Sequence, residues 1–159
     1  MKLWLELSEA LRYPEDDLER QEEYCRTFDF DRRASLHLTY HTFGDRRQRG
    51  LELVKLKRRY GQAGLELSGS ELPDYLPAML EFAALDPERG EALLNEHRPA
   101  LELVRARLHE RESQYASVLD RVVGALPRVT RAQLDRARRA AEDGPPAELV
   151  GLEPFGEVA

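Results

Sequence analysis

Two of the four histidines, His37 and His41, stand four residues apart, so a metal site is the first chemistry to consider. On a helix this spacing places both imidazoles on one face, where they could ligate the same ion. A catalytic zinc site needs a third ligand, and the HExxH pattern is absent because LTY separates the two histidines. Histidines at this spacing are more often groove or surface residues, so a metal-dependent enzyme using His37 and His41 is kept as an alternative hypothesis.

Other motifs that organise catalytic side chains are also missing. A di-iron bundle needs Glu-x-x-His, but the residues three positions before the histidines are Ala34, Leu38, Leu94 and Ala106. Ser35 and Ser113 stand outside any GxSxG elbow, and Cys25 lies in EEYCRTF without a flanking cationic motif. Neither GxGxxG nor a P-loop pattern occurs. We therefore predict that the protein is not an enzyme and carries no cofactor and no metal of its own.

Composition predicts a soluble, helix-rich single domain. The 159 residues are 42% hydrophobic and 34% charged, and the formal charge is −6. This charge gives no overall attraction to nucleic acid, and a solvated helix face accounts for the basic stretch at 46–59. Cys25 is the only cysteine, which excludes an internal disulfide and favours a reducing compartment. With no membrane-spanning apolar run and an acidic opening segment, we expect a cytoplasmic protein without direct membrane insertion.

Hydrophobic periodicity predicts helices along most of the chain. A first helix ends at Tyr13-Pro14, and a second begins in the acidic residues 15–17 and carries Tyr24 and Phe28 on one face. Residues 34–40 alternate like a strand, yet Leu36, Tyr40 and Phe43 also fit helical spacing. We predict a helix there because the neighbouring segments are helical.

Caps and prolines mark the later helices, one of which is expected to run without a break from Pro99 to Pro127. The expected helix starts are Asp45, Asp86 with Pro87, Pro99 and Thr130. The helix from Thr130 should reach about Glu142. We expect one helical domain over 1–143 and an irregular tail over 144–159, which begins with Gly144-Pro145-Pro146.

The segment 71–82, ELPDYLPAMLEF, contains two prolines four apart. Pro77 cannot donate the hydrogen bond that a continuing helix would direct to the carbonyl of Pro73, so a helix must begin between them. Asp74 as its N-cap would put Pro77 at the third helical position. Beyond this entrance, Tyr75, Glu81 and Phe82 are candidates for a rim or groove, whereas the residues expected to pack inward are Leu76, Met79, Leu80 and Ala83.

Three blocks in order resemble the nitrate reductase molybdenum-cofactor assembly chaperones (NarJ type), within the TorD/DmsD class of redox-enzyme maturation proteins. The blocks are EEYCRTFDFDRRASLHLTYHTFGDRRQRG at 22–50, LKRRYGQAGLEL at 56–67 and ELPDYLPAMLEF at 71–82. Together they cover about half of the chain, which makes them more specific than a short motif.

The resemblance implies an all-α, single-domain helical bundle that catalyses nothing. Its expected partner is the nitrate reductase α (catalytic) subunit, whose N-terminal peptide it would hold competent for molybdenum cofactor insertion. A helical adaptor, or a chaperone for another molybdoenzyme, is the first alternative. In the family the E-x-P-D segment is associated with signal-peptide recognition. The expected peptide-binding residues are Tyr24, Phe28, Leu36, Tyr40, Glu71, Asp74, Tyr75, Glu81 and Phe82.

Two departures from the family affect these expectations. Relatives usually have additional helical sequence near 18–22, whereas this chain passes directly from the YPEDD segment into EEYCRTF. The shortened region could open a groove or favour exchange of an element between copies, so we expect either a monomer or an element-swapped dimer. His37 and His41 also stand where relatives often have aromatic residues, which makes that face more polar and sensitive to pH.

Overall fold

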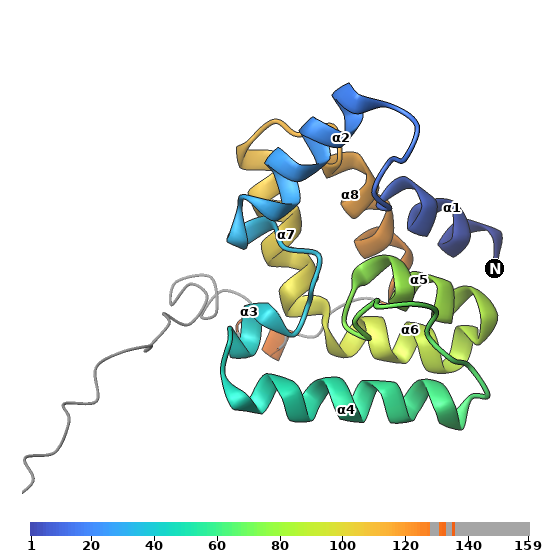
Figure 1. Cartoon of the computed structure of the whole chain (residues 1–159). Coiled ribbons are helices and arrows are strands. Elements are labelled where there is room, and N and C mark those ends of the chain that lie inside the picture. Colours follow the sequence, from blue (N-terminus) through green and yellow to red (C-terminus); the bar gives the residue numbers. More distant parts are fainter. Residues whose placement is uncertain (128–130, 133–134, 136–159) are drawn as a thin grey trace, which may run out of the picture.

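Eight α-helices build the part of the chain that the computed structural model describes, which is residues 1–127, 131–132 and 135 (Figure 1). They are α1 (Lys2–Ala10), α2 (Leu18–Tyr24), α3 (Tyr40–Phe43), α4 (Arg47–Gln62), α5 (Leu76–Leu85), α6 (Pro87–Glu96), α7 (Arg98–Glu110) and α8 (Ala116–Ala125). Helix α2 continues into a π-helical turn, Cys25–Asp29, and a 3₁₀ turn follows at Arg32–Ala34. The protein is therefore an all-α, single-domain bundle, as predicted.

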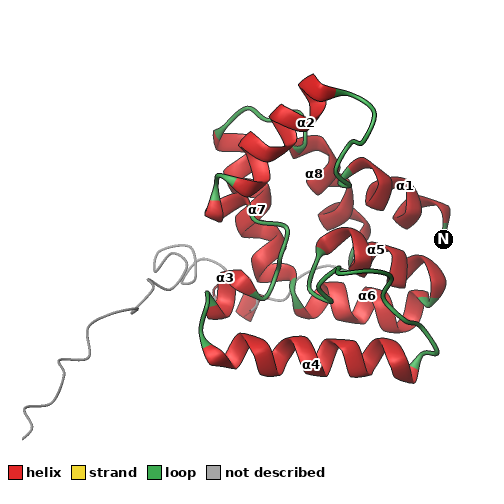
Figure 2. Ribbon diagram, in the orientation of Figure 1, coloured by secondary structure: helices red, strands yellow, loops and turns green. Residues whose placement is uncertain are grey.

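Helix α5 lies at the centre of the fold. Eight of its ten residues are buried, because its sequence LPAMLEFAAL is apolar on nearly every side. Helices α1 and α6 pack directly against it, and α4 runs across one end of the molecule (Figure 1). The loop that joins α4 to α5 passes over the surface between these two helices, as the ribbon coloured by secondary structure shows (Figure 2). Side chains on α5 and on this loop therefore share one surface.

Local capping signals correctly predicted where two helices begin. Asp17 precedes α2, and its carboxylate accepts the backbone N–H of Arg20 at 3.2 Å. Asp86 precedes α6 and accepts the N–H of Arg89 at 3.2 Å, with Pro87 in the first turn. These bonds satisfy amide groups that have no partner within their own helix.

Replacing Asp86 with alanine is expected to lower the free energy of unfolding by about 1 kcal/mol, the usual effect of losing an N-cap. Urea denaturation monitored by circular dichroism at 222 nm measures the change. Asp86→Asn is the matched control, because asparagine can still accept the amide hydrogen bond. Equal losses in the two variants would show that the cap is not what stabilises this end of α6.

The helix predicted over 34–43 is wrong for residues 35–39. This stretch is not helical, because His37 forms an isolated antiparallel bridge with Tyr75 and the chain turns at residues 38–39 into α3. Its backbone pairs with the entrance to α5, since Leu38 N–H donates to Asp74 O at 3.0 Å and Leu76 N–H to Leu36 O at 2.9 Å. The alternation of buried Leu36 and Leu38 was thus a genuine strand-like signal. His37 and His41 consequently do not share a helical face.

The unbroken helix expected between Pro99 and Pro127 is also wrong, because α7 and α8 are separate. Glu112 adopts a left-handed backbone conformation with φ of 50°, and Ser113 N–H donates to Leu108 O at 2.9 Å. This closing bond ends α7 and lets the chain turn back, so that α8 packs beside it. Both helices bury apolar side chains, including Leu101, Leu108 and Leu119.

Two further expectations concern helix starts and the C-terminal region. The predicted Asp45 cap is wrong, because α4 begins after Arg46 and no side chain caps it. The helix expected over 130–142 and the tail expected over 144–159 lie outside the described residues. Among the helices that are described, none combines the length and the apolar character needed to cross a bilayer.

Candidate functional site

The entrance to α5 differs from the expected geometry. Tyr75 is the N-cap residue, no side chain caps the helix, and Pro77 stands at its second position. The predicted capping role of Asp74 is therefore wrong. Pro77 fits because its missing amide hydrogen falls in the first turn, where an N–H would have no partner within the helix.

Asp74 instead forms the centre of a buried ion-pair network. Its side chain is wholly enclosed, with Arg49 Nη2 at 3.1 Å and His37 Nδ1 at 3.2 Å, and the Thr39 hydroxyl donates to it. Burial alone would raise the pKa of Asp74, but the bonds from His37 and Thr39 and the charge of Arg49 outweigh it and lower the pKa to about 2. The ionised carboxylate thus ties the segment 35–39 and α4 to the start of α5.

Tyr75 points toward a second cluster, which is aromatic. Its hydroxyl lies 2.7 Å from that of Tyr24, and the Tyr24 hydroxyl donates to Leu11 O at 3.1 Å. The Tyr24 ring packs against Phe28 with centroids 4.8 Å apart, and Phe28 packs against Tyr115 at the same distance. Burial, together with the neighbouring Tyr75, raises the pKa of Tyr24 far above its ordinary value, so this hydroxyl stays protonated.

Glu71 and Glu81 both meet a cation from their own chain. Arg12, just beyond the end of α1, donates from Nη1 to Glu71 Oε1 at 2.5 Å. It also donates to Glu81 Oε1 from Nη2 at 2.6 Å and from Nε at 3.2 Å. All three side chains are partly exposed. Nothing in the sequence indicated this contact, which joins residues 59 and 69 positions apart.

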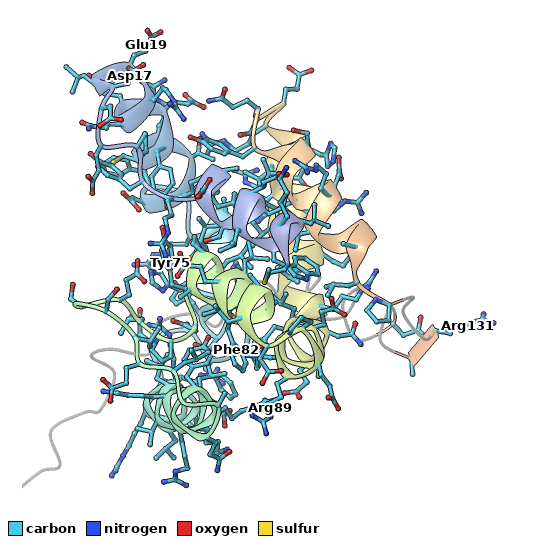
Figure 3. All side chains as sticks on the ribbon, turned by 90° about the vertical axis from the view of Figure 1, so that its right-hand side faces the viewer. Asp17, Glu19, Tyr75, Phe82, Arg89 and Arg131 are labelled. Atoms are coloured by element: carbon cyan, nitrogen blue, oxygen red, sulfur yellow. The ribbon has the colours of Figure 1, made fainter. Side chains whose placement is uncertain are left out.

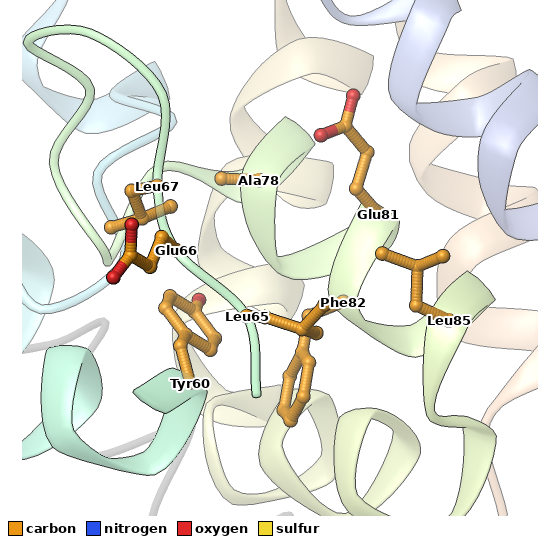
Figure 4. Close-up of a pocket in the computed structure, with 8 residues that line it drawn as sticks. All are labelled: Tyr60, Leu65, Glu66, Leu67, Ala78, Glu81, Phe82 and Leu85. Atoms are coloured by element: carbon orange, nitrogen blue, oxygen red, sulfur yellow. The ribbon is translucent and has the colours of Figure 1, made fainter. Parts of the chain in front are cut away.

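An apolar hollow opens where the α4–α5 loop crosses α5. We call it the α5 pocket, and it has a volume of about 70 Å³. Figure 4 shows Phe82 and Leu85 on the helix beside Leu65 and Tyr60, whereas the carboxylate of Glu81 is directed away from these two side chains. The lining residues are Tyr60, Leu65, Glu66, Leu67, Ala78, Glu81, Phe82 and Leu85. Its walls are thus mostly apolar, while Glu66 and Glu81 contribute carboxylates.

The α5 pocket continues beyond the loop. A neighbouring hollow of about 330 Å³ reaches Lys57 and Gly61 at the end of α4 and shares the loop residues 65–67 and Tyr60 with the first. Leu85 stands at the edge of the α5 pocket with 64% of its surface exposed. The two hollows adjoin each other, and together they form one shallow depression that extends from α5 across the loop to the end of α4.

A third hollow is more polar and lies on another part of the surface. It has a volume of about 260 Å³ and includes Phe28, Tyr40 and His37 in its lining, along with two arginines and two aspartates. The full set is Phe28, Asp29, Arg32, Ser35, His37, Tyr40, Asp45 and Arg49.

The nine expected peptide-binding residues therefore divide into several groups. Glu81 and Phe82 line the α5 pocket, and Phe28 and Tyr40 line the polar hollow. Leu36 is enclosed in the core. Tyr24 and Tyr75 bond to each other, Glu71 bonds to Arg12, and Asp74 is buried in its ion-pair network. In the view of Figure 3, Tyr75 and Phe82 are labelled along α5, well away from Asp17 and Glu19 at the outer end of α2.

The pocket also contains residues that the sequence did not single out for binding. Leu65 and Leu67 belong to a loop in GLELS, where alternation of half-buried leucines with exposed Glu66 was the available signal. Tyr60 is buried near the end of α4, with its hydroxyl donating to Pro73 O at 2.6 Å. Nothing in the sequence indicated a binding role for Leu85, because a leucine in a helix is normally expected to pack in the core.

The two histidines considered for metal binding have separate partners within the chain. His41 is buried, its Nε2 lies 2.8 Å from Ser35 O, and burial lowers its pKa. His37 faces Asp74, and its ring lies 5.3 Å from that of Tyr75. Within the described residues, no group of three or more His, Cys, Asp or Glu side chains could hold a metal ion.

Comparison with known proteins places these features in a family. Residues 1–120 match the family described as nitrate reductase delta subunit. The chain is 38% identical over 109 residues to the probable nitrate reductase molybdenum cofactor assembly chaperone NarJ of Bacillus subtilis strain 168, covering 68% of this chain and 59% of that protein. It is 44% identical over 107 residues to the Escherichia coli K12 chaperone NarJ, covering 66% and 45% respectively.

A third relative is covered over a much smaller share of its length. The nitrate reductase-like protein NarX of Mycobacterium tuberculosis H37Rv is 40% identical over 102 residues, which cover 64% of this chain and 16% of that protein. The chain thus spans about half the length of the two chaperones and a small part of the third relative. The match to the family nevertheless extends over most of the chain and includes α1 to α7 together with the α5 pocket. This chain belongs to the nitrate reductase delta subunit family.

Proposed function

We propose that the protein is a chaperone that binds the N-terminal peptide of the apo nitrate reductase α subunit and keeps it competent for molybdenum cofactor insertion and complex assembly. It would act in the cytoplasm, with no catalytic step and no cofactor of its own. The similarity to molybdenum cofactor assembly chaperones of Bacillus and Escherichia supports this class of activity. The separate partners of His37 and His41 argue against the alternative of a metal-dependent enzyme.

The α5 pocket is the observation that carries the proposal. Apolar walls suit the end of one apolar side chain of an amphipathic peptide, and the carboxylates of Glu66 and Glu81 suit a basic residue beside it. Exposed Leu85 would be covered by the peptide, which gives a favourable hydrophobic contribution. Of the nine expected binding residues, Glu81 and Phe82 are therefore proposed as direct contacts and Glu71 as a neighbouring carboxylate.

The other expected residues are proposed in supporting roles. Asp74 and Tyr75 hold the entrance to α5, while Tyr24, Leu36, Phe28 and Tyr40 pack beneath or beside it. A helical adaptor, or a chaperone for another molybdoenzyme, would use the same pocket with another apolar helix. A peptide from a second molybdoenzyme that binds as tightly as the nitrate reductase peptide would favour that alternative.

Calorimetric titration with the first thirty or so residues of the cognate reductase catalytic subunit tests the proposal. We expect one peptide to bind per chain, and Leu85→Gln to weaken binding about tenfold because a buried leucine contributes roughly 1.5–3 kcal/mol. Leu51→Gln is the matched control, since Leu51 on α4 is 61% exposed, close to the 64% of Leu85, and lies outside the pocket. Absence of binding by the unmodified protein would refute the proposal.

The proposed stoichiometry of one peptide per chain also depends on the oligomeric state of the chaperone. We propose a monomer, with exchange of an element between two copies as the alternative suggested by the short region near 18–22. Light scattering coupled to size-exclusion chromatography distinguishes them: a mass near 18.3 kDa supports the monomer, and twice that mass supports exchange.

A further inference from the structure

The contact of Arg12 with Glu71 and Glu81 has the geometry of a guanidinium receptor. The two carboxylates come from different parts of the chain, the α4–α5 loop and α5, and meet the planar fork of one arginine along its edge. Arginine matches such an arrangement better than lysine does, because its N–H groups are fixed in one plane. The carboxylates are therefore spaced to receive a guanidinium group.

Arg12 remains accessible while it occupies this position. The side chains of Arg12, Glu71 and Glu81 are 33%, 28% and 41% exposed, so water and other solutes reach all three. Ion pairs at such exposure contribute little net stability and exchange readily. Burial lowers the pKa of Arg12, but bonds to Glu71 and Glu81 more than compensate, so the guanidinium stays charged.

Helix α1 does not depend on this ion pair for its position. Trp4, Leu7 and Leu11 are buried in the core, and the Ser8 hydroxyl donates to Pro77 O at 2.9 Å in a buried bond. These contacts hold α1 against α5. The Arg12 side chain can therefore leave the carboxylates while the helix stays in place.

Glu81 connects the ion pair with the α5 pocket. The same side chain accepts two bonds from Arg12 and lines the pocket beside Phe82 and Leu85. A peptide whose apolar side chain enters the pocket would bring its neighbouring residue close to Glu81. A basic residue at that position would meet a carboxylate already occupied by Arg12.

We propose that Arg12 is an internal substitute for an arginine of the bound peptide, and that this arginine displaces it from Glu71 and Glu81 when the peptide enters the α5 pocket. The inference rests on the proposed function and adds two statements to it. The ligand is a peptide with an arginine next to a large apolar residue, and Arg12 competes with that arginine. Peptides without the arginine do not displace Arg12 and bind weakly.

The test compares two peptides on several variants by calorimetry. One is the N-terminal reductase peptide, and the other has its arginines replaced by glutamine. Arg12→Gln is expected to bind the arginine peptide about two- to fivefold more tightly than the unmodified protein does, since one competing exposed ion pair is gone. Its affinity for the glutamine peptide should not increase.

Arg105→Gln is the matched control variant. Arg105 also bridges two carboxylates, Glu102 at 3.1 Å and Asp120 at 2.6 Å, and is 40% exposed, but it lies on α7 outside the pocket. Its removal should leave both affinities unchanged. A double variant, Glu71→Gln with Glu81→Gln, should lose the preference for the arginine peptide. Thermal denaturation of each variant verifies that it is folded.

The outcomes separate the inference from the proposed function. If the unmodified protein and all variants bind neither peptide, the proposed function fails. If the unmodified protein binds but Arg12→Gln gives equal or weaker binding of the arginine peptide, peptide recognition stands and the role of Arg12 is refuted. A direct readout is the NMR signal of the Arg12 Nε–H group, which should shift on addition of the arginine peptide and stay in place on addition of the glutamine peptide.

Discussion

Asp74→Asn is expected to lower the free energy of unfolding by about 3 kcal/mol at pH 7, because breaking a buried ion pair leaves the remaining partner without a counter-charge. Arg49, whose side chain is only 17% exposed, would lose its carboxylate, and Thr39 and His37 would lose a charged acceptor. Urea denaturation of both proteins measures the difference. Asp45→Asn is the control, since Asp45 is an exposed acid near the same end of α4.

The effect of Asp74 should depend on pH with a defined sign. Its pKa falls from an ordinary value of 3.8 to about 2 in the folded protein, so the folded state favours the ionised form. The contribution to stability is therefore complete above about pH 4 and is lost as the pH falls toward 2. The stability difference between the unmodified protein and Asp74→Asn should shrink over this range. A difference that stays constant down to pH 2 would contradict the ionised, paired state of Asp74.

Such a network was not foreseeable from local sequence, although much of the helical framework was. Asp17 and Asp86-Pro87 indicate helix starts because capping acts over three or four residues. Asp74 matched the same pattern, but its carboxylate binds partners 25 to 37 residues away and leaves the cap position to Tyr75. Tertiary contacts, which the capping pattern does not contain, decided the role of this side chain.

The two misassigned helices have different causes. Residues 35–39 alternate apolar and polar side chains, and backbone pairing of residues 36–38 with the entrance to α5 competes with the helix there. The turn after α7 has neither glycine nor proline to announce it, since Glu112 takes up the left-handed conformation that glycine usually provides. In both cases the local pattern failed to predict the backbone path, and Leu36, which was expected to bind peptide, is enclosed in the core.

The candidate site could be predicted only in part, because several of its contacts depend on tertiary packing. Glu81 and Phe82 follow from the periodicity of α5, so their place near a groove was inferable. Arg12 reaches Glu71 and Glu81 only because α1 packs along α5, and Leu65 and Leu67 reach the pocket only because the loop crosses that helix. These contacts depend on how the elements are arranged, which a single sequence does not display.

Gly90 in α6 is the position where adding a single methyl group is expected to lower the stability of the fold most. A Cβ atom added there would lie 2.2 Å from Ala83 Cα and 2.5 Å from Ala83 N, both of which are backbone atoms of α5. The two helices must therefore separate to accommodate alanine. We expect Gly90→Ala to lower the free energy of unfolding by about 3 kcal/mol, the upper range for overpacking a close contact. Urea denaturation measures this loss.

Gly50→Ala in α4 is the matched control, and it should change stability in the opposite direction. No atom lies within 4 Å of a Cβ at that position, so close packing does not account for this glycine. Alanine should then stabilise the helix by about 0.5–1 kcal/mol, its ordinary advantage over glycine. Because Phe82 and Glu81 adjoin Ala83 on α5, Gly90→Ala should also weaken peptide binding, whereas Gly50→Ala should not. Equal stability changes in the two variants would mean that α5 and α6 are not in backbone contact.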